Sequence, residues 1–302
     1  MAAIILLIFA PLLAGVINRA KAFFAGRTGQ PLLQVYFDIA KLLRKGVVYS
    51  RTTTWVFRAG PIVSLAAVLC AACMIPLGGV RALMSFPGDF ILVAYLLGLA
   101  RFMTVLAALD TGSAFEGMGA SREVQFAALT EPALLLALIS IGSATGDWSL
   151  HEMFAVVNAH AWAAHGAVLA MATVALLAVL LVENSRVPFD DPNTHLELTM
   201  IHEVMVLDHS GPDLAFIEFG ASVKFAMFAA LLSGLIVPVR TGLAWVDASA
   251  ALAGLFAVAV VAGVIESCMA RLRILRVPQM LVAASVLAGV AILVALAQGV
   301  AP

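Results

Sequence analysis

The sequence predicts an all-α integral membrane protein with about eight transmembrane helices and an amphipathic helix on the cytoplasmic side. Hydrophobic residues make up 63% of its 302 residues, and charged residues only 12%. The mean hydropathy is +1.06, and several apolar segments reach the roughly 20 residues that a helix needs to cross a bilayer. Since lipid cannot satisfy backbone hydrogen bonds, each of these segments must be helical.

The apolar segments follow one another along the whole chain. We expect them to span the membrane at about residues 2–19, 57–79, 89–109, 124–145, 160–182, 214–238, 243–265 and 279–299. They form a single membrane domain over residues 1–302, whose first span occupies residues 1–20. No cleavable signal peptide is expected, because the first apolar run lacks a basic leader and a small-residue cleavage site.

The distribution of Lys and Arg predicts the orientation of the chain. The first, third, fifth and seventh connections contain 13 basic residues, whereas the other side has only Arg81 and Arg240. By the positive-inside rule the odd-numbered connections face the cytoplasm, and both termini lie on the non-cytoplasmic side of the inner (cytoplasmic) membrane. The net charge of −1 without a clustered basic face argues against nucleic-acid binding.

Residues 21–52 form an interfacial segment in which apolar and basic side chains alternate. The stretch LLQVYFDIAKLLRKGVVYS places Lys41, Arg44 and Lys45 among leucine, isoleucine and aromatic residues. A basic amphipathic helix of this kind lies in the plane of the headgroups, close to anionic lipid. It either anchors the chain or forms one side of the entrance to a cavity.

The charged residues inside the predicted spans include Arg101, Glu131, Glu218 and Lys224. Each costs about 2.5–3.5 kcal/mol at a helix centre on insertion scales, so such residues face the bundle interior, pair with one another or line water. They are the first candidates for an ion path. The alternative is a static ion pair that fixes how the helices pack.

Glu131 is followed by Pro132. A proline inside a helix leaves the carbonyl of Ala128 without its donor and displaces the chain, so we expect a kink or a break at Glu131. An unpaired carbonyl beside a carboxylate can hold water, which suits a proton relay. The alternative is a proline kink with an incidental acid.

Residues 183–213 form an acidic cytoplasmic loop, in which Pro188 and Pro192 prevent a regular helix. The acids in and around it are Glu183, Asp190, Asp191, Glu197, Glu203, Asp208 and Asp213. Crowded and desolvated carboxylates bind protons more tightly, so some of these acids can carry protons near neutral pH. The alternative is a solvated loop that recognises a basic partner subunit.

The sequence predicts no redox centre, metal site or catalytic centre in this chain. Cys70 and Cys73 form a CxxC within an apolar run, but an iron–sulfur cluster needs four ligands. His202, Glu203 and His209 are spaced as HExxxxxH, which differs from the zinc-binding HExxH. No phosphate-binding glycine loop or nucleophile elbow is present either.

Three motifs carry a resemblance that covers essentially the whole chain: GRTGQPLLQVYFDIAKLL after the first span, REVQFAALTEP entering the fourth, and ENSRVPFDDPNTHLELT after the fifth. They resemble the membrane-anchor subunit of the complex I superfamily, namely the H or ND1 subunit of NADH:quinone oxidoreductase and its counterparts in membrane-bound nickel–iron hydrogenases. The stretch THLELTMIHEVMVLDHSGPDLAFIEFG is most similar to the formate hydrogenlyase and hydrogenase-4 branch.

The resemblance implies a subunit that docks a hydrophilic redox arm onto antiporter-like membrane subunits and couples electron transfer to proton or ion movement. The [4Fe-4S] and NiFe centres belong to the hydrogenase large and small subunits and an iron–sulfur subunit, and this chain holds no cofactor. The implied proton or ion path comprises Arg101, Glu123, Glu131, Glu197, Glu203, Asp208, Glu218 and Lys224. The implied docking residues are Glu183, Arg186, Asp190, Asp191 and Asp213, and His195 and His202 extend the usual pattern.

Two other functions remain open at this point. The chain could be the quinone-binding subunit of a complex I-like enzyme, with a quinone-like cavity behind Gln30, Gln34 and Asp38. It could also be a stand-alone ion transporter, since buried acids and a broken helix suit one.

Overall fold

The computed structural model confirms the all-α membrane fold, and it describes residues 1–190, 201–270, 272 and 276–298. Within these residues, eight helices are long and apolar enough to cross a membrane. They are α1 (Ala2–Phe24), α3 (Trp55–Ala72), α4 (Asp89–Asp110), α5 (Ala114–Thr145), α7 (Ala159–Glu183), α8 (Gly211–Ile236), α9 (Ala244–Cys268) and α10 (Val277–Ala297). Three shorter helices are α2 (Gln34–Leu43), α6 (Leu150–Val156) and the 3-10 turn η1 (Val204–Val206).

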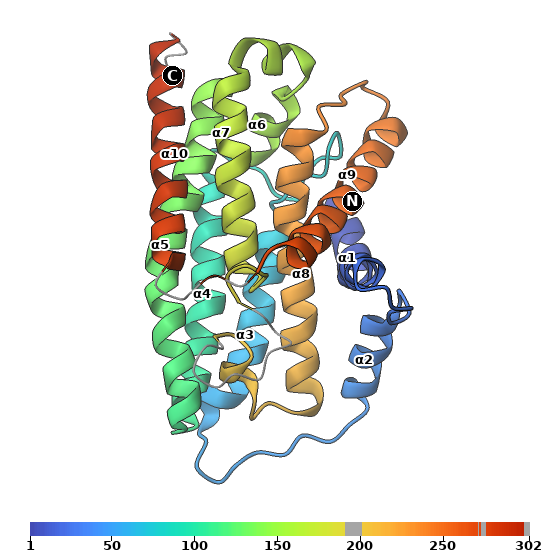
Figure 1. Cartoon of the computed structure of the whole chain (residues 1–302), viewed down its shortest axis with the longest axis vertical. Coiled ribbons are helices and arrows are strands. Elements are labelled where there is room, and N and C mark those ends of the chain that lie inside the picture. Colours follow the sequence, from blue (N-terminus) through green and yellow to red (C-terminus); the bar gives the residue numbers. More distant parts are fainter. Residues whose placement is uncertain (191–200, 271, 273–275, 299–302) are drawn as a thin grey trace.

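Helix α8 is the central element of the bundle. It packs against α1, α2, α3, α7 and α9, while α5 packs against α4, α7 and α10. In the most apolar stretch of α8, 72% of the residues are buried, compared with 28–56% in the corresponding stretches of the other spanning helices. In Figure 1 most long helices run along the long axis, whereas α1 is seen nearly end-on, α9 crosses obliquely and α2 lies at the outer edge. The arrangement therefore places α8 between α1 and α9 on one side and the remaining long helices on the other.

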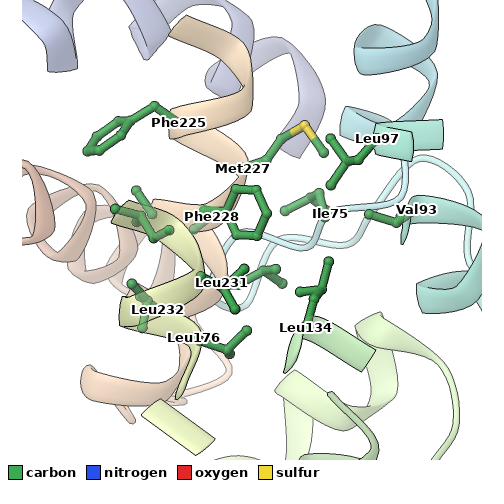
Figure 2. Packing of buried hydrophobic residues seen from close by; sticks show 14 of the residues in the cluster. Ile75, Val93, Leu97, Leu134, Leu176, Phe225, Met227, Phe228, Leu231 and Leu232 are labelled. Carbon is green, nitrogen blue, oxygen red and sulfur yellow. The ribbon is translucent and has the colours of Figure 1, made fainter. Parts of the chain in front are cut away.

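The apolar core is built around the second half of α8. Figure 2 shows the side chains of Met227, Phe228 and Leu231 directed toward Ile75, Val93, Leu97 and Leu134, and Leu232 close to Leu176, whereas Phe225 is directed to the other side of α8. These partners come from α4, α5, α7 and the chain after α3, so the α8 side chains join four elements. Because lipid is as apolar as leucine, close packing rather than transfer from water holds such helices together.

Glycines allow the closest helix contacts. A Cβ atom on Gly263 of α9 would lie 2.7 Å from the Cβ atom of Ala20 and 3.1 Å from the carbonyl oxygen of Ile17, both on α1. A Cβ atom on Gly60 of α3 would lie 2.8 Å from the Cβ atom of Ala107 on α4. Small residues at these positions let the helix backbones approach, as is common in membrane proteins.

Two buried or half-buried acids fix helix ends. The carboxylate of Asp110 accepts the backbone N–H groups of Thr54 (2.6 Å) and Phe57 (3.3 Å), which joins the end of α4 to the start of α3. The carboxylate of Asp89 accepts the backbone N–H of Leu150 at 2.7 Å, which joins the start of α4 to α6. Helix N-termini have unsatisfied N–H groups, so these acids have a structural role.

The largest differences from the expected helix ends are in α3 and α5. Helix α3 ends at Ala72 rather than near residue 79, since Pro76 disfavours a continued helix and the chain then turns at Gly78, which has a φ of 57°. Helix α5 begins at Ala114, ten residues earlier than expected, and its 32 residues extend over about 48 Å. Since the hydrocarbon core is about 30 Å thick, part of α5 extends beyond it or crosses it at a tilt.

The chain does not break at Glu131. Helix α5 runs without interruption through Pro132 to Thr145. An interruption that the sequence does not predict occurs instead in α7, where His165 has a non-helical φ of −123° and ψ of 26°.

Candidate functional site: a buried charge cluster beside a cavity

The site is centred on Arg101, in the middle of α4. Its Nε atom lies 3.1 Å from Oε1 of Glu123, and its Nη1 atom lies 2.9 Å from Oε1 of Glu131. Its Nη2 atom contacts Oε1 of Glu183. A planar guanidinium offers five N–H donors in a fixed geometry, so one arginine can hold several carboxylates. Three acids from two helices therefore share one cation.

The local structure explains how these four side chains meet. Glu123 and Glu131 are eight residues apart on α5, about 80° around the helix, so both are directed toward α4. Gly98 leaves room for one of them, because a Cβ atom there would lie 3.2 Å from Oε1 of Glu131. Glu183 is the last residue of α7, which ends about halfway along the molecule in Figure 1.

Three further residues extend this group. The Nζ atom of Lys224 on α8 lies 3.8 Å from Oε2 of Glu183. The Nε2 atom of His202 lies 3.1 Å from Oε2 of Glu123, and its Nδ1 atom lies 3.7 Å from Oδ2 of Asp190. We call the whole set the central cluster: Arg101, Glu123, Glu131, Glu183, Asp190, His202 and Lys224.

His202 is protonated at neutral pH. Burial alone would lower its pKa, but the carboxylates of Glu123 and Asp190 outweigh burial and raise the pKa of His202 to about 9. The central cluster then contains three cations, Arg101, Lys224 and His202, and four carboxylates. Among the described residues, Glu123 and Glu183 each contact a second cation, whereas Glu131 shares Arg101 with them and contacts no other.

The crowding of three carboxylates on one guanidinium has a chemical consequence. Carboxylates this close repel one another, and an added proton or cation relieves the repulsion. The side chains of Arg101, Glu123 and Glu183 are at most 10% exposed, whereas that of Glu131 is 44% exposed. The central cluster can therefore accept one more positive charge, and Glu131 is its most accessible carboxylate.

A cavity of about 270 Å³ lies beside the central cluster. Its charged lining includes Arg101, Glu183, Arg186 and Lys224, and its apolar lining comes from α1, α3, α4 and α8. Glu203, a predicted path residue, also lines it. The cavity is mainly apolar with a charged end, and that end offers the polar partners that water molecules between the carboxylates would need.

A second group of charges lies at the end of α9. The carboxylate of Glu266, whose side chain is fully buried, contacts Nζ of Lys21 at 2.7 Å and Nη1 of Arg186 at 3.2 Å. We call these three residues the α9 triad. Sequence reasoning missed Glu266 because the expected span ended at residue 265, one residue before it. A carboxylate directly after an apolar segment, with basic residues following, is the signal that could have found it.

The other predicted path residues lie outside the central cluster. Glu218 is half-buried on α8, close enough to Asp38 on α2 for the two carboxylates to interact electrostatically. Asp208 has an exposed side chain and interacts electrostatically with the carboxylate of Glu116. Asp213 is buried in the first turn of α8 and interacts electrostatically with Tyr49.

The residues predicted for a quinone-like cavity lie elsewhere. Gln34 is on α2, where its Nε2 atom donates to Oδ1 of Asp38 at 2.9 Å. Gln30 is exposed in the connection before α2. None of the three lines the 270 Å³ cavity. Asp191, His195 and Glu197 fall outside the described residues.

His209 is buried close to the start of α8. Its ring stacks on Phe57 with centroids 4.0 Å apart and an interplanar angle of 8°. Burial lowers the pKa of His209 to about 4, so the ring is neutral. Among the described residues, no three His, Cys, Asp or Glu side chains converge to hold a metal ion.

Comparison with known proteins identifies the family. A family model described as NADH dehydrogenase matches residues 1–297. The chain belongs to the NADH dehydrogenase family. Its relatives in Escherichia coli (strain K12) include formate hydrogenlyase subunit 4, 32% identical over 78% of this chain and 76% of that protein. Hydrogenase-4 component C is 34% identical over 78% of this chain and 73% of that protein.

A more distant relative is the H-type subunit of the NADH-quinone oxidoreductase of Anaplasma phagocytophilum (strain HZ). It is 27% identical over 67% of this chain and 62% of that protein. Among solved structures, one chain of the membrane-bound sulfane sulfur reductase, an archaeal respiratory membrane complex, superposes with a TM-score of 0.83. The match covers 97% of this chain and 98% of that one, and at 22% identity it shows a common fold.

Proposed function

We propose that this NADH dehydrogenase family member is the membrane-anchor subunit of an energy-converting nickel–iron hydrogenase of the formate hydrogenlyase or hydrogenase-4 type. The similarity to membrane subunits of such complexes supports a subunit of an energy-converting membrane complex. In this proposal the chain docks the hydrophilic redox arm and couples electron transfer to proton or ion movement. It is embedded in the inner membrane with both termini on the non-cytoplasmic side.

The observation that carries the proposal is the crowding of carboxylates around Arg101. A purely structural ion pair needs one carboxylate for its cation, whereas Glu123, Glu131 and Glu183 all contact the guanidinium of Arg101. One of these carboxylates accepts a proton and gives it up again when the surrounding charge changes. A redox step in a neighbouring subunit supplies such a change, because electron transfer alters the charge near the docking surface.

The central cluster also gives the relay a direction. His202 and Asp190 belong to the chain between α7 and α8, which is the predicted docking loop. Glu123 contacts both His202 and Arg101, and Arg101 contacts Glu131, eight residues or about 12 Å further along α5. Arg101 itself stays protonated, so a proton taken up at Glu123 acts on Glu131 by weakening the hold of Glu123 on the guanidinium that the two carboxylates share. Glu131, the most exposed carboxylate of the cluster, is the proposed exit toward the antiporter-like subunits.

The proposed partners supply the electron chemistry. The NiFe and [4Fe-4S] centres lie in the large and small hydrogenase subunits and in an iron–sulfur subunit. These partners bind at the docking loop, which contains Arg186 and Asp190. This chain contributes the charged relay and the membrane attachment.

A second candidate is the quinone-binding subunit of a complex I-like enzyme. The observation in its favour is the cavity, which combines an apolar lining from α1, α3, α4 and α8 with a charged end at Arg101 and Glu183. The two functions are distinguished by adding a short-chain quinone to the purified complex. Quinone-dependent oxidation of the electron donor supports the quinone-binding function, and its absence supports the hydrogenase function.

The proposed function is tested on the assembled complex in native membranes. Affinity purification of the tagged chain should recover nickel–iron and iron–sulfur subunits. The variants Glu123→Gln and Glu131→Gln should assemble but lose proton or sodium movement linked to hydrogen production in membrane vesicles. The matched control is Glu152→Gln, because Glu152 is an exposed glutamate on α6 and does not belong to the central cluster.

Two results would overturn the proposal. One is a chain that purifies without metal-containing subunits. The other is wild-type ion movement in assembled complexes that carry both glutamine substitutions.

A further inference from the structure

We propose that Glu266 is a positioning residue that holds the guanidinium of Arg186 at the cavity. This inference rests on the proposed function, because it concerns the relay that the cavity serves. Arg186 belongs to the predicted docking loop, whereas Glu266 lies 80 residues later at the end of α9, outside every predicted site.

The geometry of Arg186 requires an external anchor. Arg186 follows α7 by three residues, in a turn where Ser185 has a φ of 52°, so no helix fixes its side chain. Its Nη1 atom donates to Oε1 of Glu266 at 3.2 Å. Its guanidinium carbon lies 5.4 Å from the ring centroid of Phe225, a cavity residue on α8. The carboxylate and the ring together place a fixed positive charge at the cavity.

Glu266 is itself held from the opposite side. Lys21 on α1 contacts its Oε2 atom at 2.7 Å, and Gly263 allows α1 and α9 to approach closely one turn before Glu266. The side chain of Glu266 is fully buried, that of Arg186 is 19% exposed and that of Lys21 is 25% exposed. The contact between α1 and α9 thus fixes the position of a residue in the docking loop.

The position of Arg186 matters for the central cluster. Arg186 lines the same cavity as Glu183 and Lys224, and it lies three residues after Glu183 in the chain. A fixed cation at this place sets the electrostatic potential at the cluster carboxylates, and charge interactions are strong where water is scarce. A movement of Arg186 away from the cavity therefore changes how readily the central cluster accepts and releases a proton.

The α9 triad offers a test that separates positioning from charge balance. With two cations and one carboxylate its net charge is +1. Glu266→Gln raises the net charge to +2 and replaces the ion pair with Arg186 by at most a weaker hydrogen bond to a neutral amide oxygen. The double variant Glu266→Gln with Lys21→Met restores the net charge to +1 but leaves Arg186 without its carboxylate.

The experiment measures ion movement per hydrogen formed, in membrane vesicles that contain the assembled complex. Glu266→Gln is expected to lower coupled ion movement by about tenfold or more, a loss typical of removing one partner of a buried charge pair. The double variant is expected to stay equally impaired, whereas Lys21→Met alone, which keeps the contact between Glu266 and Arg186, is expected to lose less coupling than Glu266→Gln. Glu266→Asp is expected to recover part of the activity, because it keeps a carboxylate.

Recovery of coupling in the double variant would show that Glu266 only balances charge, which overturns the inference. Wild-type coupling in Glu266→Gln would overturn it as well. If Glu266→Gln does not assemble, Glu266→Asp decides: it should assemble with reduced coupling, and full coupling refutes the positioning role. The variants Glu123→Gln and Glu131→Gln distinguish failure of the inference from failure of the proposed function. If only the inference fails, these two variants are still impaired in coupled ion movement; if the proposed function fails, they are not.

Discussion

Replacement of Arg101 by methionine is the most direct test of the central cluster. The substitution keeps a long side chain but removes the cation that three carboxylates share, those of Glu123, Glu131 and Glu183. Removing one partner of a buried ion pair costs about 3–5 kcal/mol, because it leaves the other charge uncompensated. At about 2 °C per kcal/mol for a chain of this size, the expected fall in the unfolding midpoint is roughly 6–10 °C.

The midpoint is measured by thermal unfolding of the detergent-solubilised chain. Arg81→Met is the matched control, because Arg81 is exposed in the connection between α3 and α4 and should leave the midpoint unchanged. Arg101→Lys should fall in between, since an ammonium keeps the charge but cannot reach three carboxylates in the geometry of a guanidinium. A midpoint for Arg101→Met within about 2 °C of wild type would refute the reasoning.

Three further predictions concern residues around the site. The pKa of His202 is raised to about 9, so its stabilising contribution is complete below pH 6.5 and is lost as the pH rises through 9. Thermal unfolding of the wild type should therefore show a loss of up to about 3 kcal/mol of stability over this range, and His202→Gln should not show that loss. The lowered pKa of His209, about 4, predicts the opposite: stability falls as pH drops from 6.5 to 4, and His209→Phe should abolish that acid loss in the same assay. Gly263→Val should separate α1 from α9 and lower the unfolding midpoint, whereas valine at Gly289, where added atoms meet open space, should not.

The helical fold follows from the sequence because hydropathy and helix length are local properties. The sequence predicts all eight spans, and its alternating pattern reveals the amphipathic stretch that contains α2. Helix ends are less accurately predicted: α5 continues through polar residues before 124, since a helix does not stop where its hydropathy falls.

The charge cluster is predictable only in part. Arg101, Glu131 and Lys224 stand out in the sequence because a charged residue inside a span needs a partner. Which partner each one meets depends on the packing of α4 beside α5, α7 and α8, and no local pattern encodes that contact. Glu183 illustrates the limit: the sequence predicts a docking residue, and the structure places it at the end of α7 in contact with Arg101.

Acidic residues in or at the ends of apolar segments look alike in the sequence but have different roles in the structure. Asp89 and Asp110 lie at the ends of α4, and each accepts backbone N–H groups from a neighbouring helix start. Glu123 and Glu183 contact a cation in the interior instead. The difference arises because the unsatisfied N–H groups at a helix start donate to a carboxylate that lies close to them. It cannot be predicted until the position of the neighbouring helix is known.

Glu131 shows why stability and function should diverge in the central cluster. It is the most exposed of the three carboxylates that crowd the guanidinium of Arg101. Glu131→Gln keeps an oxygen that can accept from Nη1 of Arg101 while removing one of these three negative charges, so the unfolding midpoint should stay equal or rise. Coupled ion movement should be lost, because an amide cannot take up a proton. If Glu131→Gln stabilises the chain and stops the relay, Glu131 serves function rather than stability. A lower midpoint together with normal coupling would instead show that Glu131 serves only to hold Arg101.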